Sequence, residues 1–527
     1  MDFKSSPPGI VPWPANPPAP RDAARPTRHW LRALTLGAVL LVGAPTARGA
    51  ATFNVLAFGA DITGRTWSTT AIQQAIDACT RDGGGTVFFP PGRYRVAPVS
   101  LQHNVTLQFA KECFIDAPRL YDEYVPFRVL IRALGVTNVA LRGPVVITGQ
   151  GSNYWTVVPN PVTWYAASDA RPVPLVQFSN CSDVVVDGIT IVNAPSWSLA
   201  SSSSTNVTIR NVTIHNDFFG PNSDGIDLCQ SKNVLVTGCR VATGDDAIVI
   251  KNLAHTTPEN VTRNIVVTNC DLISRRYGLK VGTESRVGIV EDILFTDCRC
   301  RAYHPDFGQH AGVALESVDG GILRNVRVRR LQTEGALSPI FIRLGNRGSG
   351  QNRSSPIPGR LEDILIEDLT AFVPTIQREY PIQIHGLPTA TVSNIVLRNI
   401  RVQSRGGVTF ADLGVTNVAQ LVVPEIANDY PRVDMFGWLP AFGVYCRHAR
   451  ALTLENRELL ALTPDVRPAL TGNDVRGLVL SNVVASYPGI ETRTPASLCF
   501  VTNSPALTLT VQTNLTNPPG GFILSTP

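Results

Sequence analysis

Hydrophobic and polar positions follow one seven-residue phrase that recurs along most of the chain. Its first position is Asn, Asp or Gly, its fourth and seventh positions are always apolar, and its sixth is always Gly, Asn or Asp. This pattern predicts a short strand, a turn residue that tolerates positive φ, and a second short strand. The phrase occurs as DVVVDGI (183–189), NVTIRNV (206–212), NVLVTGC (233–239), NIVVTNC (264–270), DILFTDC (292–298), GGILRNV (320–326), DILIEDL (363–369), NIVLRNI (394–400) and GLVLSNV (477–483).

The spacing of the copies indicates the fold. Successive copies start 23, 27, 31, 28, 28, 43, 31 and 83 residues apart. Repetition near 23–31 residues is typical of a solenoid whose coils bury one another's apolar faces. The coils are rich in β-branched residues and show no helical period, so we predict an all-β fold, a right-handed parallel β-helix. Longer intervals are expected to be inserted loops, the largest of them within 401–476.

The segment before the first copies has a different pattern. A strand is predicted at 53–60, and a strand followed by a turn at 86–96. Between them, 69–85 has the apolar spacing of a short amphipathic helix. A solenoid needs a polar terminal cap, which this helix can supply. We therefore predict a single β-helix domain over 50–527, with 50–100 as its N-terminal cap.

Residues 1–49 are predicted to be a leader. A Pro-rich stretch (5–26) precedes the apolar core LTLGAVLLV (34–42), and the small residues Ala47-Arg48-Gly49 follow it. This order is typical of a signal peptide, and the apolar run is too short to span a bilayer as a stable helix. We expect export, to the periplasm or to the exterior of the cell.

The formal charge of +5 lies mostly in that leader. Residues 1–49 contain six Lys or Arg and two Asp, so the remainder carries about +1. The sequence pI of about 8.7 therefore gives no case for a nucleic-acid partner. No segment beyond the leader is long and apolar enough to cross a membrane, so no membrane partner is expected either. The protein is expected to be monomeric.

Three of the ten cysteines share the seventh position of the phrase, at Cys239, Cys270 and Cys298. Equivalent positions of a solenoid stack, so we predict a column of small buried side chains. Metal binding is disfavoured because no His or carboxylate shares that position, and no cofactor is expected. The other cysteines could pair, but their connectivity does not follow from the sequence.

Two acidic motifs follow consecutive copies, PNSDGID (221–227) and TGDDAIVIK (243–251). Asp224 and Asp245 are 21 residues apart, about one coil, so stacking should bring Asp224, Asp245 and Asp246 together. Mutual repulsion raises at least one pKa in such a cluster, which allows acid–base hydrolysis of a glycosidic bond. The alternatives are carboxylates that cap turns, bind Ca²⁺ or lie on a solvated surface.

These motifs and their order resemble glycoside hydrolase family 28, the polygalacturonases and rhamnogalacturonan hydrolases. ITGQGSNYW (147–155) and the segment 171–199 precede the acidic motifs as they do in that family, and the similarity covers roughly 50–400. The resemblance implies single-displacement, inverting hydrolysis. Asp245 would be the general acid, while Asp224 and Asp246 would activate the attacking water. Asn222 would orient a neighbouring carboxylate or a sugar hydroxyl.

Two departures from the family pattern concern the binding of the substrate. Tyr277 stands where the family has the His of its Gly-His-Gly, and Ala314-Leu315-Glu316 replaces the Arg-Ile-Lys that grips a galacturonate carboxylate. Glu316 is expected to repel a carboxylate.

Other cations could supply the lost contacts. Lys251, Lys280 and Arg343 are predicted to bind substrate. For Lys280 and Arg343 the alternative is a surface ion pair with Glu284 or Glu316. The loop 301–310, with Tyr303, could form a subsite wall or be an ordinary turn-rich loop.

The leading hypothesis is an exported inverting hydrolase of pectic polysaccharides or oligosaccharides, of galacturonan or rhamnogalacturonan type. Insertions at 253–263 and 346–360 could close one end of the groove and make the enzyme exo-acting. The alternatives are a Ca²⁺-dependent polysaccharide lyase or epimerase on the same architecture, and a noncatalytic β-helix that only binds carbohydrate.

Overall fold

A computed structural model describes most of the chain beyond the leader. The described residues are 51–158, 165–168, 170–253, 260–303, 308–348, 358–373, 378–486, 488, 499–510 and 523–526. The predicted leader lies outside them, and so do residues 254–259 and 349–357 of the two predicted insertions. Residues Ala50–Pro527 form one structural unit, which contains all the described helices and strands.

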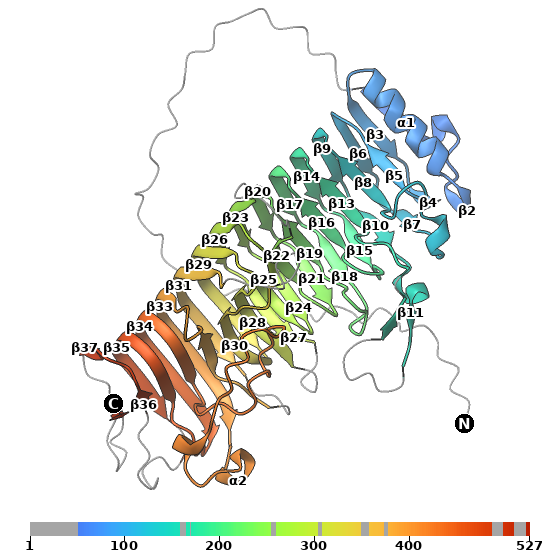
Figure 1. Cartoon of the computed structure of the whole chain (residues 1–527). Coiled ribbons are helices and arrows are strands. Elements are labelled where there is room, and N and C mark those ends of the chain that lie inside the picture. The colour runs from blue at the N-terminus through green and yellow to red at the C-terminus, as the bar shows by residue number, and fades with distance from the viewer. Residues whose placement is uncertain are drawn as a thin grey trace, which may run out of the picture. The chain divides into compact units, whose positions relative to one another are not determined.

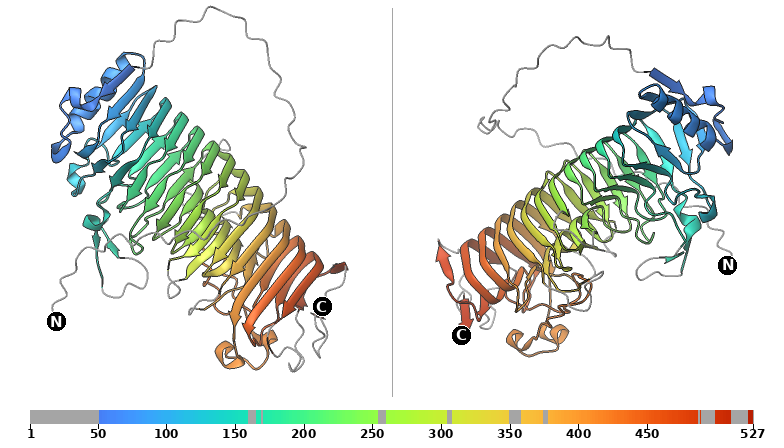
Figure 2. Two further views of the ribbon diagram at one scale, coloured as in Figure 1. Left: turned by 180° about the vertical axis from the view of Figure 1, so that it is seen from behind. Right: turned by 45° about the horizontal axis from the view of Figure 1, so that its top comes forward.

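Parallel strands from successive coils pair into three ladders that run along this unit (Figures 1 and 2). We call them ladders A, B and C. The prediction of a right-handed parallel β-helix is confirmed, and the apolar side chains of all three ladders meet in one continuous core.

Each coil contributes one strand to a ladder over most of the unit. Ladder A contains β5 (Val99–Leu101), β8 (Ile131–Leu134), β13 (Val176–Ser179), β16 (Leu199–Ser202), β19 (Ile226–Cys229), β22 (Ile248–Asn252), β25 (Tyr277–Ser285), β28 (Gln309–Ser317), β30 (Ala336–Leu344), β32 (Ile382–His385), β36 (Cys499–Thr502) and β38 (Ile523–Thr526). Ladder B contains β1 (Ala51–Asn54), β3 (Gly85–Phe89), β6 (Val105–Phe109), β9 (Thr137–Arg142), β14 (Ser182–Asp187), β17 (Thr205–Arg210), β20 (Lys232–Thr237), β23 (Val261–Thr268), β26 (Ile289–Thr296) and β37 (Thr508–Thr510). Ladder C contains β2 (Thr63–Trp67), β4 (Gly92–Arg95), β7 (Cys113–Asp116), β10 (Val145–Thr148), β15 (Thr190–Val192), β18 (Thr213–His215), β21 (Arg240–Thr243), β24 (Asp271–Ser274) and β27 (Arg299–Ala302).

Later coils have longer strands that pass from one ladder into the next. They are β29 (Ile322–Glu334), β31 (Arg360–Phe372), β33 (Val392–Gly406), β34 (Val444–Thr463) and β35 (Leu470–Ser486). A separate antiparallel pair joins β11 (Trp155–Thr156) and β12 (Ala166–Ala167). The short helices beyond the cap are η2 (Tyr121–Glu123), η3 (Gly151–Tyr154), α2 (Phe410–Leu413) and η5 (Val418–Gln420).

The seven-residue phrase marks the corner between ladders B and C. The sixth residue has a positive φ in every predicted copy, from Asn482 at 50° to Gly188 at 74°, as the prediction requires. One copy is misplaced, because Asp292 of the preceding coil stacks on Asn325 and not on Gly320. The copy in that coil therefore runs over 325–331.

The N-terminal cap contains the predicted helix as α1 (Thr69–Arg81), whose apolar stripe packs on the first coil. The predicted strand at 53–60 is only partly correct. It stops at Asn54, whose side chain accepts a hydrogen bond from the Leu56 backbone and begins the 3-10 helix η1 (Val55–Phe58). Gly59, with a φ of 91°, ends that helix.

The large insertion is shorter than predicted, because β34 and β35 are regular coils that occupy most of 444–476. The inserted loops lie between β33 and β34, and we call residues 421–441 the insert. Val433, Phe436 and Leu439 of the insert pack against outward-facing residues of ladder A. The insert thus covers the outer face of ladder A beside β25, β28 and β30, where Figure 1 shows it in orange.

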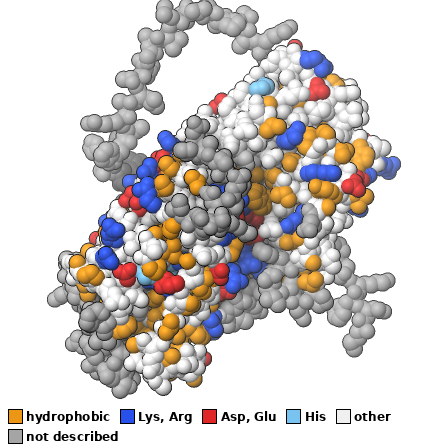
Figure 3. Space-filling model, viewed as in Figure 1, with side chains coloured by type: hydrophobic (Ala, Val, Ile, Leu, Met, Phe, Trp, Pro, Cys, Tyr) orange, Lys and Arg blue, Asp and Glu red, His pale blue; other side chains and the backbone are white. Residues whose placement is uncertain are grey.

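All ten cysteines lie in the described part, and each is buried and free. The predicted column at Cys239, Cys270 and Cys298 is confirmed, since all three side chains face the core. In the described residues no helix has the length and apolarity needed to cross a membrane. On the face shown in Figure 3, basic and acidic side chains are interspersed.

Candidate active site

Three aspartates meet just before two neighbouring strands of ladder A. Asp224 precedes β19, while Asp245 and Asp246 precede β22. The Gly225 N–H donates to the Asp246 carbonyl at 2.9 Å, so Asp224 lies beside Asp246 rather than beside Asp245. All three side chains are nearly buried, with exposed fractions of 2%, 9% and 3%. The predicted cluster is therefore present, although it is much drier than a solvated surface.

A close backbone approach shapes the turn before Asp245. A Cβ on Gly244 would lie only 2.6 Å from the Phe218 carbonyl oxygen, so no other residue fits there. The Gly244 N–H donates to the Ser223 hydroxyl at 3.1 Å, and that hydroxyl donates to the Gly220 carbonyl at 2.8 Å. Gly244 and Ser223 thus fix the two acidic motifs against each other.

Lys251, at the end of β22, connects two carboxylates of the previous coil. Its Nζ lies 2.8 Å from Asp224 Oδ2 and 2.7 Å from Asp227 Oδ1. The same ammonium lies 3.7 Å above the Trp197 ring, which adds a cation–π contact. The lysine side chain is only 5% exposed, and its charge is balanced inside the cluster.

Lys280, in the middle of β25, also bridges two carboxylates, one from the coil before it and one from the coil after it. Its Nζ lies 3.1 Å from Asp246 Oδ2 and 3.9 Å from Glu316 Oε2. The Tyr277 ring lies beneath it, with the centroid at 4.3 Å. Lys251 and Lys280 were both predicted to bind substrate, and the structure places both within the carboxylate cluster.

Asp245 differs from its neighbours because neither lysine pairs with it. Burial raises its pKa well above the ordinary value, and the negative charges of Asp224 and Asp246 raise it further. Burial also raises the pKa of Asp246, but the Lys280 charge opposes that rise. Of Asp245 and Asp246, Asp245 is therefore the one that holds a proton more readily, and burial also raises the pKa of Asp227 well above its ordinary value.

Tyr277 stands in line with Asp246, because the Ala247 N–H donates to the Tyr277 carbonyl at 2.9 Å. Its side chain is 2% exposed and belongs to the apolar cluster that joins ladder A to the insert. The hydroxyl donates to the Pro431 carbonyl at 3.5 Å. Tyr277 therefore supports Lys280 and the insert together.

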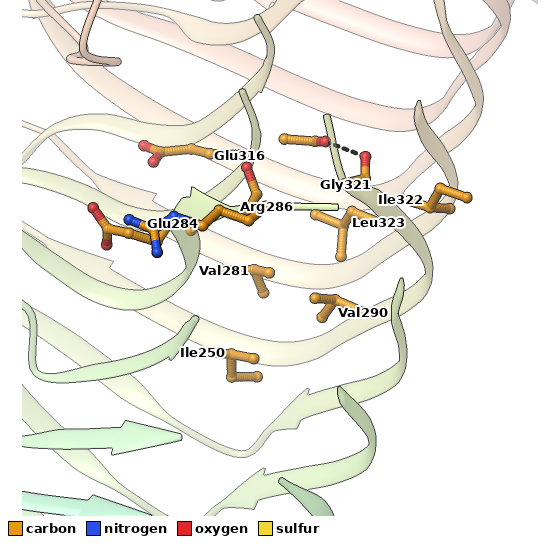
Figure 4. A pocket seen from close by; sticks show the side chains of 12 residues that line it. Ile250, Val281, Glu284, Arg286, Val290, Glu316, Gly321, Ile322 and Leu323 are labelled. Atoms are coloured by element: carbon orange, nitrogen blue, oxygen red, sulfur yellow. Dashed lines mark hydrogen bonds between the residues drawn. The ribbon is translucent and has the colours of Figure 1, made fainter. Parts of the chain in front are cut away.

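Glu316 is fully buried, and its Oε2 accepts a hydrogen bond from the Thr283 hydroxyl at 3.0 Å. Figure 4 shows its carboxylate pointing away from the interior side chains Ile250 and Val281. The expectation that Glu316 repels a substrate carboxylate does not fit this position, because the side chain is covered and faces Lys280. Ala314, at the first position of the replaced motif, is buried under the insert.

The remaining predicted binding residues differ in exposure. Asn222 is exposed, and its Oδ1 accepts a hydrogen bond from Arg171 at 2.7 Å, which fixes it at the rim of the cluster. Arg343 is 1% exposed and donates to the Ile426 carbonyl at 2.7 Å. Arg343 thus holds the backbone of the insert.

Sequence reasoning missed residues that the stacking brings next to the aspartates. Arg276 lies in line with Asp245, and its Nη1 is 2.8 Å from Nε2 of His310. Asp227 accepts a hydrogen bond from Lys251, and Thr283 donates one to Glu316. The signal for Asp227 was available, since a carboxylate between the apolar residues Ile226 and Leu228 must face outward from the core.

An aromatic wall borders the other side of the turn at Gly244. The Phe218 ring stacks on Tyr303 with centroids 4.0 Å apart and an interplanar angle of 23°. Phe219 continues the wall, with the Arg275 guanidinium 4.7 Å from its centroid. Tyr303 is half exposed, but residues 304–307 of the loop lie outside the described residues, so its role as a subsite wall stays a prediction.

Comparison with known proteins agrees with this geometry. The model of the family "Glycosyl hydrolases family 28" matches residues 92–420, and that of "Rhamnogalacturonase A/epimerase, pectate lyase-like" matches 52–109. Exopolygalacturonase A of Aspergillus niger is 26% identical over 366 residues, which cover 63% of this chain and 80% of that protein. An endo-polygalacturonase of Pectobacterium carotovorum subsp. carotovorum is 24% identical over 288 residues, covering 52% and 65%.

A solved structure with the same fold is a hyperthermoactive exopolygalacturonase from Thermotoga maritima. It superposes with a TM-score of 0.56 at 22% identity, over 78% of this chain and 93% of that one. The family model and the polygalacturonase relatives show that the protein is a glycoside hydrolase, and its fold is a β-helix. The family model covers more than half of the chain, and this protein therefore belongs to glycosyl hydrolases family 28.

Proposed function

We propose that this glycoside hydrolase cleaves pectic polysaccharides or oligosaccharides by single displacement with inversion. The observation that carries the proposal is the unequal pairing of the three aspartates. Asp224 and Asp246 each contact a buried lysine, and Asp245 contacts neither. A cluster with one protonated and two charged carboxylates is the equipment that inverting hydrolysis needs.

In this mechanism, Asp245 donates its proton to the glycosidic oxygen as the bond to the anomeric carbon breaks. Asp224 and Asp246 orient a water on the opposite face of the sugar, and one of them accepts its proton. The new bond forms from the side opposite the leaving group, so the configuration at the anomeric carbon inverts.

Exo action is part of the proposal. The insert covers the outer face of ladder A directly beyond the aspartates, along β25, β28 and β30. A long substrate chain could extend from the cluster in one direction only, past the aromatic wall. Relatives named exopolygalacturonase support this preference, although an endo-polygalacturonase is also among the relatives.

The proposed substrate is a galacturonan or rhamnogalacturonan type of pectic chain. Names of the relatives support a pectic substrate. The motif positions where the family grips a carboxylate are occupied by Ala314 and Glu316, both buried. Among the described residues, Arg276 is the cation whose charge most strongly opposes the rise in the pKa of Asp245.

Export is also proposed, on the basis of the leader pattern at 1–49. The mass of the mature protein, which shows where its N-terminus lies, tests this proposal.

A screen of defined pectic oligosaccharides tests the function. Wild-type protein is expected to release reducing sugar from a pectic substrate, with one short product dominating from the start of the reaction. Asp245→Asn is expected to lose at least about 10³-fold in kcat, because general acid catalysis contributes roughly 10²–10⁴-fold. An Asp245→Asn variant with unchanged turnover would remove this residue from the mechanism. Dominant internal cleavage would contradict exo action.

A further inference from the structure

Lysine is scarce in this protein, and the acidic cluster uses two of the few that exist. Only five of the 46 Lys and Arg residues are lysines. Lys251 and Lys280 are 4% and 1% exposed, and both ammonium groups lie among carboxylates. A lysine has a compact charge with three donors at one point, so it can bridge carboxylates from different coils where a planar guanidinium would not fit.

Both lysines bridge two carboxylates, but the two partners of Lys251 belong to the coil before it, while those of Lys280 belong to the coils before and after it. Each ammonium touches one aspartate of the acidic cluster and one further carboxylate that the reaction does not use. Lys251 joins Asp224 to Asp227, and Lys280 joins Asp246 to Glu316. The further carboxylates are both 0% exposed. Asp245 lies in line with Arg276, and neither lysine pairs with it.

Burying a charge without a partner is costly, so the pairing decides which aspartates can be charged. An ammonium about 3 Å away favours the carboxylate form strongly in a buried site. The further carboxylates attract the same ammonium, and they therefore weaken its effect on the aspartates. Besides the bridged groups, the charged and titratable side chains that face the bridges are Arg276, Tyr277, Glu284, His310, Arg347 and Tyr430.

We propose that Lys251 and Lys280 are positioning residues of the reaction, which keep Asp224 and Asp246 charged for water activation and leave the proton to Asp245. The proposal rests on the proposed hydrolytic function and deepens it. Neither lysine needs to touch the sugar.

The experiment is the pH dependence of kcat/KM for four proteins, the wild type, Lys280→Met, Glu316→Gln and the double variant. The acidic limb of the profile is the range of low pH over which kcat/KM falls. Lys280→Met is expected to move this limb to higher pH by at least about one pH unit, because Asp246 loses its cation. Glu316→Gln is expected to leave the acidic limb close to its wild-type position, because burial raises the pKa of Glu316 to about 7 and the group is largely protonated over that limb. The double variant is expected to have the same acidic limb as Lys280→Met.

Lys232→Met is the matched control, since Lys232 lies on ladder B in β20, away from the cluster. Its pH profile should be that of the wild type. A lysine with a merely structural role would lower activity without moving the acidic limb, and that result would overturn the proposal. A rise in KM with kcat and the limb unchanged would also overturn it, because it would indicate a substrate contact.

Two readouts keep this test separate from that of the hydrolytic function. If the wild type cleaves no pectic substrate, the proposed function fails, whatever the lysine variants do. If the wild type is active and Asp245→Asn is not, but Lys280→Met keeps the wild-type acidic limb, only the lysine proposal fails. Should Lys280→Met not fold, Lys251→Met decides, because Asp224 then loses its cation and the acidic limb must move up relative to the wild type.

Discussion

At the scale of single residues, Glu316 connects the chemistry of the cluster to the stability of the fold. It is fully buried beside Lys280, and burial raises its pKa to about 7 from an ordinary value of 4.5. The folded chain therefore binds more protons than the unfolded chain between these two values. Stability contributed by this group is highest below about pH 4.5 and falls as the pH rises toward 7.

Glu316→Gln should remove that pH dependence. A shift from 4.5 to about 7 corresponds to roughly 3 kcal/mol across the interval. The difference in unfolding free energy between variant and wild type should therefore change in favour of the variant as the pH rises from 4.5 to 7. Denaturant unfolding at several pH values measures it. A difference that stays constant over this range would contradict the buried, proton-binding state of Glu316.

The three aspartates were predictable from the sequence, while most of their partners were not. Asp224, Asp245 and Asp246 stand in consecutive coils, so stacking alone brings them together. Which residue meets which depends on the offset between strands. Ile226 pairs with Ile248, Ile248 with Leu279 and Leu279 with Val313, so the offset changes at every coil. The bridge from Lys280 to Glu316 therefore could not be read from a fixed repeat length.

At the scale of elements, one coil has a charged residue at a position that is apolar in the neighbouring coils. Arg457 of β34 pairs in register with Ile400 and Val483, which are both core residues at the seventh position of the phrase. Its side chain is 2% exposed, and no guanidinium nitrogen has a hydrogen-bond partner within the described part of the chain. Burial lowers its pKa well below the ordinary value.

Arg457→Leu is expected to stabilise the protein. Replacing a buried, poorly paired charge by an apolar side chain of similar size stabilises by about 1–4 kcal/mol. Thermal or denaturant unfolding measures the gain. Arg401→Leu is the matched control, because Arg401 is an exposed residue whose ion pair with Glu458 contributes about 0–1 kcal/mol. Destabilisation by Arg457→Leu would indicate that the guanidinium is satisfied after all.

The same residue helps explain why one coil was not predicted. The coil at 451–457 (ALTLENR) was missed because its first position is Ala451 and its seventh is Arg457, and the pattern admits neither residue. The interval of 83 residues before the last copy therefore contains the insert and one further coil. The β-helix itself was predictable, because its turn residues need positive φ and its apolar positions repeat. The positions of individual coils were not, since two residues outside the pattern hide a repeat.

At the scale of the whole molecule, the insert decides which part of ladder A is open. The guanidinium groups of Arg343 and Arg447 donate to carbonyl oxygens of residues 423–426, and Arg447 also contacts Glu425 at 3.3 Å. The sequence predicts that the insertion lies within 401–476, but it does not predict which strands the insertion contacts. Arg343 lies 83 residues before Ile426, and Arg447 belongs to the strand that follows the insert, so no pattern within the insert itself reports these contacts.

Arg343→Met should loosen the insert without removing it. The variant loses a charge-assisted bond to the Ile426 carbonyl, and such bonds contribute about 1.5–3 kcal/mol. Faster proteolysis within 421–441 is expected, together with a higher share of internal cleavage on long pectic chains. Arg401→Met, on the far side of the coil, is the control and should change neither. Unchanged proteolysis and product pattern would separate the insert from exo action.

The central claim is that Asp245 acts as the acid opposite a water activated by Asp224 and Asp246. The most direct measurement is NMR of the anomeric proton of the sugar released in the first moments of the reaction. We predict that the fresh product has the configuration opposite to that of the cleaved bond, and that mutarotation then occurs. Release with retained configuration, or an unsaturated product, would contradict this mechanism.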